Sequence, residues 1–171
     1  RQDSILNPQR MTYITIQQLF VNNIPFYQSE QYLYMKKEIE NGRTTYWCKN
    51  TKDIDEYFNR LRDLYEDIKI NGYKSQKDLI KEGPEKVDPR IKGTYADEIK
   101  IFVDRNGCLL LGNGGTHRLL IADLLNINEV PVIICGVHNN WAKVSFKKNK
   151  KDILSAVKNE LNQKYKTVAQ V

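Results

Sequence analysis

The chain has 171 residues, of which 40% are hydrophobic, and this supports one ordinary hydrophobic core with little room for a second domain. Lysine and arginine number 27 against 21 aspartate and glutamate residues, so the formal charge is +6 and an anionic partner is favoured. The three cysteines are far apart and match no CxxC spacing, which argues against a disulfide framework or a zinc site. We therefore expect buried thiols in a soluble, cytoplasmic protein, since the sequence also lacks the roughly 20 apolar residues that a membrane span requires.

The N-terminal half contains three expected elements. The letters "MTYITIQQLF" (11–20) read as a short strand, and a turn at Pro25 precedes a helix for which Ser29 is a candidate N-cap. The strongest helical pattern runs over 53–70, and Asn71-Gly72 supplies a stop signal. Its apolar positions recur at helical spacing: Ile54, Tyr57, Phe58, Leu61, Leu64, Tyr65 and Ile68.

The segment "KEGPEKVDPRIKGTYA" (81–96) is rich in proline, glycine and charge, which predicts an exposed loop that is either a passive surface segment or a lid. After it, "EIKIFVDRNGCLLLG" (98–112) predicts a β-hairpin that turns at Asn106-Gly107. A helix over 117–127 and a buried strand over 130–137 follow. Strand, helix and returning strand imply a right-handed crossover over a mixed sheet.

The C-terminal segment predicts one basic helix over 147–171. A narrow apolar stripe of Ile153, Val157, Leu161 and Tyr165 marks the face that should pack on the rest of the domain. The charge run "KKNKK" (147–151) either forms a solvated helix start or contacts a nucleic-acid backbone.

The turn "GNGGTHR" (112–118) connects the second strand of the predicted hairpin to the predicted helix. A helix that begins at Thr116 leaves its first N–H groups unpaired and carries partial positive charge there, which suits an anion. Glycines can adopt positive φ and let a ligand approach, Thr116 can cap the helix, and His117 and Arg118 can add donors or charge. The alternative is a purely steric turn whose His-Arg pair faces water.

This turn resembles that of the ParB/sulfiredoxin superfamily, in which a Gly-Gly-Cys-His-Arg turn follows a strand; here "GGTHR" stands at 114–118. The wider order is similar to ParB-like domains, with "LYEDIKINGYKSQ" before the hairpin and "NEVPVII" after the helix, so the resemblance covers about residues 60–137. It implies an α/β fold with a mixed sheet and flanking helices in a single domain. We therefore divide the chain into an N-terminal extension (1–50), a nucleotide-binding core (51–146) and the basic helix (147–171).

The resemblance also implies a site for ATP, or CTP, together with Mg²⁺. Its phosphate turn maps onto Gly114, Gly115, Thr116, His117 and Arg118. The box that lines the nucleotide pocket in ParB-like domains maps onto Lys74, Ser75 and Gln76.

Thr116 occupies the place of the sulfiredoxin cysteine, so sulfinic acid reduction is not expected. The superfamily includes single-domain kinases, which implies transfer of phosphate from ATP to a small hydroxyl compound, with positioning and charge neutralisation as the main requirements. Our candidate catalytic residues are Glu98 and His117. Further carboxylates that could serve as base or metal ligand are Glu66, Asp67, Asp97 and Asp104, and none of the four is assigned as a metal ligand.

Two other functions stay open. The first is a non-catalytic, nucleotide-dependent switch or nucleic-acid-binding module that uses the basic tail, and the second is a nuclease. His138 and Trp141 could line the mouth of the pocket, with Trp141 stacking on a base; Trp141 could equally be a residue at the edge of the core.

Overall fold

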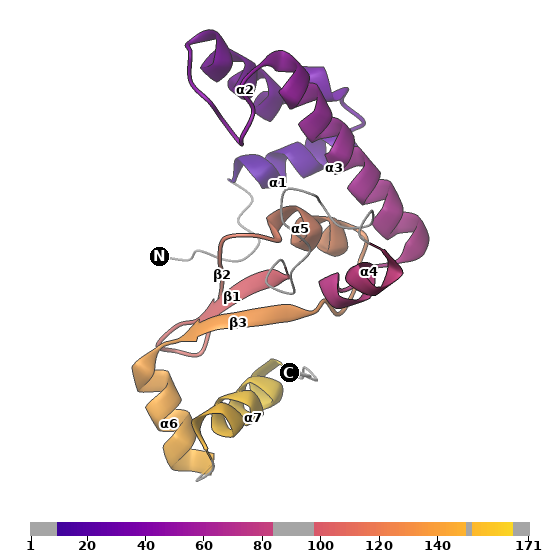
Figure 1. Ribbon diagram of the computed structural model, residues 1–171. Coiled ribbons are helices and arrows are strands. Elements are labelled where there is room, and N and C mark those ends of the chain that lie inside the picture. The colour runs from indigo at the N-terminus through magenta and orange to yellow at the C-terminus, as the bar shows by residue number, and fades with distance from the viewer. Residues whose placement is uncertain (1–9, 84–97, 150–151, 166–171) are drawn as a thin grey trace. The chain divides into compact units, whose positions relative to one another are not determined.

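The computed structural model describes residues 10–83, 98–149 and 152–165 (Figure 1). The described residues form seven α-helices and a three-stranded mixed sheet, which confirms the expected α/β class. They separate into two compact units. The helical unit contains the described residues of Leu6–Ile99 and Gly114–Pro131, and the sheet unit contains those of Lys100–Asn113 and Val132–Val171.

The N-terminal segment of the helical unit is helical, so the strand predicted for residues 11–20 is wrong. Helix α1 (Met11–Ile16) continues into the π-helical turn η1 (Gln17–Val21). A strand would send successive side chains to opposite faces, whereas helical spacing gathers the apolar ones on one side. The residues that share one hydrophobic cluster here are Tyr13, Ile16, Leu19 and Phe20. Tertiary packing therefore overrides the local β-propensity of this segment.

Two longer helices follow the short helix η2 (Phe26–Gln28). Helix α2 (Glu30–Glu40) begins as predicted after Ser29, whose hydroxyl accepts a hydrogen bond from the Tyr32 amide. Helix α3 (Thr51–Asn71) is the helix predicted over 53–70, and Gly72 ends it with a φ of 75°. Its start two residues before the predicted one is explained by Asn50, whose side chain accepts from the Asp53 amide.

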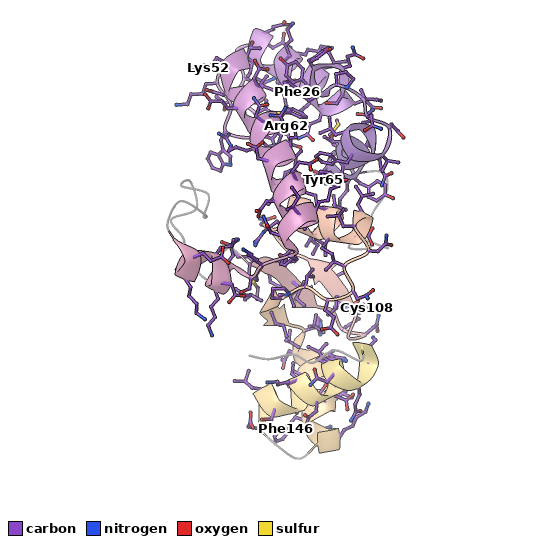
Figure 2. The ribbon with its side chains drawn as sticks, turned by 90° about the vertical axis from the view of Figure 1, so that its right-hand side faces the viewer. Phe26, Lys52, Arg62, Tyr65, Cys108 and Phe146 are labelled. Carbon is purple, nitrogen blue, oxygen red and sulfur yellow. The ribbon has the colours of Figure 1, made fainter. Side chains whose placement is uncertain are left out.

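Aromatic rings fill the space between these helices (Figure 2). The Phe26 ring lies 5.7 Å from that of Tyr32 and 5.6 Å from that of Phe58, measured between centroids. Further along α3, Phe20 stacks on Tyr65 at 4.0 Å. Burial of such rings stabilises the helical unit.

Two shorter helices complete the helical unit. Helix α4 (Gln76–Glu82) follows α3, and helix α5 (Thr116–Leu124) is the helix predicted after the glycine turn. Most of the loop predicted over 81–96 lies outside the described residues.

The sheet has the strand order β2-β1-β3, and its hairpin is the predicted one. Strand β1 (Ile99–Val103) pairs antiparallel with β2 (Leu109–Leu111), and Gly107 turns the hairpin with a φ of 75°. Strand β3 (Val132–Val137) exists as predicted, but none of its residues is fully buried. The burial prediction is wrong because β3 lies at an edge of a small sheet, where less of a strand is covered than in a central position.

Two helices stand where one basic helix was expected. Helix α6 (Asn139–Asn149) contains the first lysines of the run, and α7 (Ile153–Tyr165) carries the predicted stripe. Val157 and Leu161 are buried against Val103 of the sheet unit, but Ile153 is exposed and does not extend the stripe.

The three cysteines are all free thiols, yet only Cys48 is buried, whereas Cys108 and Cys135 are exposed. The expectation of buried thiols is therefore wrong for two of them. Within the described ranges, no helix is both long enough and apolar enough to span a membrane.

Candidate functional site

The start of α5 is the centre of the candidate site, and it differs from the prediction in one respect. The helix begins at Thr116 as expected, with the Leu119 amide donating to the Gly115 carbonyl at 2.9 Å. The cap position, however, is Gly115, which has no side chain with which to cap the helix. Thr116 is already inside the first turn, so its predicted capping role is wrong.

The two glycines before this helix serve different purposes. Gly115 has a φ of 73°, and a Cβ added to it would lie 2.7 Å from the Ile99 Cα, so packing alone requires glycine. Gly114 has a φ of 106°, but a Cβ there would meet no atom within 4 Å. Gly112 is packed closely on Phe102 of the sheet unit. Among the three glycines of this turn, Gly114 alone combines a left-handed backbone with open space beside it.

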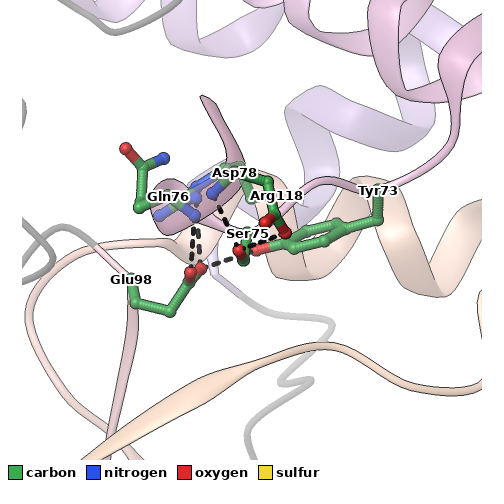
Figure 3. A network of polar contacts seen from close by, with 6 residues as sticks. All are labelled: Tyr73, Ser75, Gln76, Asp78, Glu98 and Arg118. Carbon is green, nitrogen blue, oxygen red and sulfur yellow. Dashed lines mark hydrogen bonds and ion pairs between the residues drawn. The ribbon is translucent and has the colours of Figure 1, made fainter. Parts of the chain in front are cut away.

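Arg118 projects from the first turn of α5 into a cluster of polar groups (Figure 3). Its Nη1 lies 3.2 Å from Glu98 Oε1, and the two side chains are only 11% and 8% exposed. The same carboxylate accepts from the Tyr73 hydroxyl at 3.2 Å and from the backbone amide of Gln76 at 2.8 Å. Both oxygens of Glu98 are thus occupied, and the guanidinium is held in one orientation.

Tyr73 gives this cluster a neutral donor. Burial raises the pKa of the Tyr73 phenol, and the nearby Glu98 carboxylate raises it further, although Arg118 acts in the opposite direction. The Arg118 guanidinium also lies 6.0 Å from the centre of the Tyr73 ring. Tyr73 therefore stays protonated and can donate to Glu98 throughout the neutral pH range.

His117 points to a different set of partners. Its Nε2 lies 2.9 Å from the Tyr57 hydroxyl on α3. The Tyr57 hydroxyl oxygen in turn accepts from the side-chain amide of Gln31 at 3.0 Å. The side-chain carbonyl oxygen of Gln31 lies 2.7 Å from the Thr15 hydroxyl. That hydroxyl also lies 2.9 Å from the backbone carbonyl oxygen of Met11. Thr15 and Gln31 are completely buried. We call the series Thr15, Gln31, Tyr57 and His117 the neutral relay.

The order of donors in the neutral relay bears on the histidine. Because the Tyr57 oxygen accepts from Gln31, we expect its own hydrogen to be directed toward His117, which would make Nε2 an acceptor and place the ring hydrogen on Nδ1. A contact from His117 to a phosphate would then use Nδ1. The relay fixes the histidine ring as the ion pair fixes Arg118.

The predicted box after α3 is only partly engaged at this site. Gln76 joins it through its backbone amide, as described above. Ser75 instead caps α4 and bonds to the Asp78 side chain, and Lys74 forms an ion pair with Glu82 at 2.8 Å. The side-chain carbonyl oxygen of Gln76, Oε1, is buried and has no hydrogen-bond partner among the groups that the structure describes.

Other residues considered from the sequence have contacts of their own elsewhere. Asp104 accepts from the amides of Asn106 and Cys108, and these bonds lower the pKa of its carboxyl. Asp67 accepts from Asn71, and Glu66 lies 3.9 Å from Lys69, while Asp97 falls outside the described residues.

The sheet unit explains three further candidates. A Cβ on Gly107 would lie 2.3 Å from the Trp141 indole nitrogen, so Trp141 is packed on the hairpin, as its core-edge interpretation expects. His138 accepts from the Asn140 amide through Nδ1. Lys148 pairs with Glu160 at 3.1 Å.

Sequence reasoning missed three residues that matter at the site. Tyr57 was assigned only to the apolar stripe of α3, and Gln31 and Tyr73 were assigned no role. The signal for Tyr57 was its residue type, because a tyrosine on a buried face needs a partner for its hydroxyl. The identity of that partner depends on long-range packing that the sequence does not display.

Within the described part of the chain, no group of three or more histidine, cysteine, aspartate or glutamate side chains could hold a metal ion. Comparison with known proteins gives no match: no protein-family model, no curated protein and no solved structure corresponds to this chain.

Proposed function

We propose that the start of α5 binds the phosphates of a nucleotide, ATP or CTP, and that the protein transfers phosphate from it to a small hydroxyl compound. The observation that carries the binding proposal is the combination of Gly114 with Arg118. Beside an open, left-handed glycine, the first turn of the helix presents its backbone amides together with a guanidinium that Glu98 already orients. Charge-assisted bonds from such groups are the usual means of holding phosphate.

The ion pair with Glu98 defines how binding would proceed. The guanidinium has five N–H donors, and in our proposal Arg118 keeps its bond to Glu98 when it contacts a phosphate. A triphosphate would also add negative charge beside this buried carboxylate. In our proposal, Glu98 and Tyr73 orient Arg118, while Arg118, the α5 amides and His117 contact the anion. Mg²⁺ arrives with the nucleotide as part of the substrate.

The phosphotransferase part of the proposal rests on the resemblance to single-domain kinases of the ParB/sulfiredoxin superfamily. A base is needed to orient the acceptor hydroxyl, but with its Nε2 bonded to Tyr57 and its hydrogen on Nδ1, His117 would meet an acceptor or a phosphate as a hydrogen-bond donor. A specific observation favours the alternative of a nucleotide-dependent switch without turnover. Both oxygens of Glu98, the other candidate base, are occupied by donors.

Isothermal titration with ATP and with CTP, each with and without Mg²⁺, tests the binding step. We expect saturable binding that Arg118→Ala weakens at least about tenfold, because charge-assisted bonds to phosphate are lost. Arg62→Ala is the matched control, since Arg62 is an exposed arginine on α3 of the same unit and the substitution removes the same charge (Figure 2). Equal affinity of the Arg118→Ala variant and the native chain would disprove the phosphate site.

Release of ADP in the presence of a pool of small hydroxyl metabolites tests the reaction. Turnover that depends on one metabolite would establish a kinase and identify the acceptor. Binding without turnover would support the nucleotide-dependent switch. Absence of binding would mean that "GNGGTHR" (112–118) is a purely steric turn.

A further inference from the structure

We propose that the turn formed by Thr45–Cys48 holds the base of the nucleotide whose phosphates lie at the start of α5. This inference rests on the proposed function. It assigns a second part of the ligand to two residues, Tyr46 and Trp47, that the sequence did not single out.

The turn has an unusual backbone. Thr45 and Cys48 form an antiparallel bridge, with N···O distances of 3.2 and 2.8 Å in the two directions. The two residues between them both have positive φ, 48° for Tyr46 and 68° for Trp47. Turns of this shape normally contain asparagine and glycine, because side chains with a Cβ are strained there. Two large aromatic residues in these positions require a compensating reason.

Packing explains one of the two aromatic residues and leaves the other unexplained. Cys48 is buried in the aromatic cluster of the helical unit, and the Tyr46 ring lies 5.9 Å from the Tyr57 ring. Burial also raises the pKa of the Tyr46 phenol, with the nearby Tyr34 as a smaller cause. Trp47 is 91% exposed and makes no ring contact with another aromatic side chain of the described residues. A strained turn therefore presents an indole to solvent.

The turn is connected to the phosphate site through Tyr57. The Tyr57 ring packs against Tyr46 on one hand and lies 5.8 Å from the His117 ring on the other, with its hydroxyl bonded to His117. All of these residues belong to the helical unit. Two successive ring-to-ring contacts thus link Tyr46 to the first turn of α5, and in our proposal the nucleotide spans this separation with its base at the aromatic turn.

The chemistry of the turn suits a base. Aromatic rings stack on any nucleobase through its π-face, with little discrimination between bases. We therefore expect ATP and CTP to bind with similar affinities, and either to bind more tightly than inorganic tripolyphosphate, which has no base to stack.

Titration of the full chain with ATP and with inorganic tripolyphosphate separates this inference from the proposed function. Trp47→Ala should weaken ATP binding about tenfold and leave tripolyphosphate binding unchanged. Tyr46→Leu should act in the same direction, which guards against an effect peculiar to one side chain. Tyr27→Ala is the control, because Tyr27 is another exposed aromatic residue of the helical unit.

Each outcome has a distinct meaning. If the native chain binds tripolyphosphate but Trp47→Ala leaves ATP affinity unchanged, the base site is wrong and the phosphate site stands; Trp47 would then be free to serve a protein partner. Equal losses for ATP and tripolyphosphate would also overturn the base site. If the native chain binds neither ligand, the proposed function fails and the base site fails with it.

Tryptophan fluorescence gives an independent readout, since Trp47 and Trp141 are the only tryptophans. In a Trp141→Phe background, ATP should quench the remaining emission and tripolyphosphate should not. Absence of quenching by saturating ATP would contradict stacking on Trp47.

Discussion

His117 and Arg118 are neighbours in the first turn of α5, yet their side chains enter two polar networks of different character. His117 ends the neutral relay, in which hydroxyl, amide and imidazole groups are joined by hydrogen bonds. Arg118 enters a charged cluster built on the Glu98 carboxylate. The difference teaches that consecutive helical residues, about 100° apart around the axis, can be positioned by independent means. Four substitutions test this distinction.

The largest effect is expected in the charged cluster. Arg118→Ala leaves the Glu98 carboxylate buried without its cation, and we expect the free energy of unfolding to fall by about 3 kcal/mol. Urea denaturation measures this loss. The double variant Arg118→Met with Glu98→Gln should recover most of it, because no unpaired charge remains. A double variant as unstable as the single one would show that the ion pair is not the cause.

A loss of about 2 kcal/mol is expected at the centre of the neutral relay. Gln31→Leu keeps the side-chain volume but leaves the hydroxyls of Thr15 and Tyr57 without their buried partner. The same denaturation experiment at low and high salt distinguishes the networks. The Gln31→Leu loss should not depend on salt, since no charge is involved; a loss that salt abolishes would contradict a neutral relay.

Tyr57→Phe should cost about 1 kcal/mol, because it removes one hydroxyl while the ring remains packed. The sharper readout is the imidazole itself. Nitrogen-15 NMR of His117 should show a hydrogen on Nδ1 in the native chain and a changed tautomer balance in this variant. An unchanged balance would mean that Tyr57 does not position the histidine.

The last effect, at Tyr73, appears only at alkaline pH. Because burial raises the pKa of this phenol above its ordinary 10.0, the folded state favours the protonated form. Its contribution to stability is therefore complete below pH 10 and declines as the pH rises further, by at most about 1.4 kcal/mol per pH unit. Tyr73→Phe removes the titrating group, so the stability advantage of the native chain over this variant should shrink between pH 10 and 11. A constant difference across this range would contradict the burial of the phenol.

The sequence was informative where local signals and packing agree. The helix over 53–70 combines an apolar stripe with a glycine stop, and the hairpin at Asn106-Gly107 combines strand patterns with a turn residue of positive φ. The start of α5 at Thr116 was also readable, since glycines precede an apolar periodic segment. The phosphate-binding role of that start remains a prediction.

Tertiary structure alone decided the rest. Residues 11–20 contain β-branched side chains, which favour a strand. The segment is nevertheless helical, because helical spacing places its apolar side chains together in the hydrophobic cluster around Ile16. Gly115 was interpreted as a ligand-facing glycine, whereas its contact with Ile99 makes it a packing requirement and leaves Gly114 as the open position.

The partners of the two site residues are the clearest case. The letters "GGTHR" (114–118) predict where the helix starts, because glycine conformation and apolar periodicity act within a few residues of the chain. They do not predict that His117 meets Tyr57, 60 residues earlier, or that Arg118 meets Glu98 across 20 residues. Hydrogen bonds between distant segments depend on how whole helices pack. The apolar stripes that determine this packing do not show which polar groups it brings together.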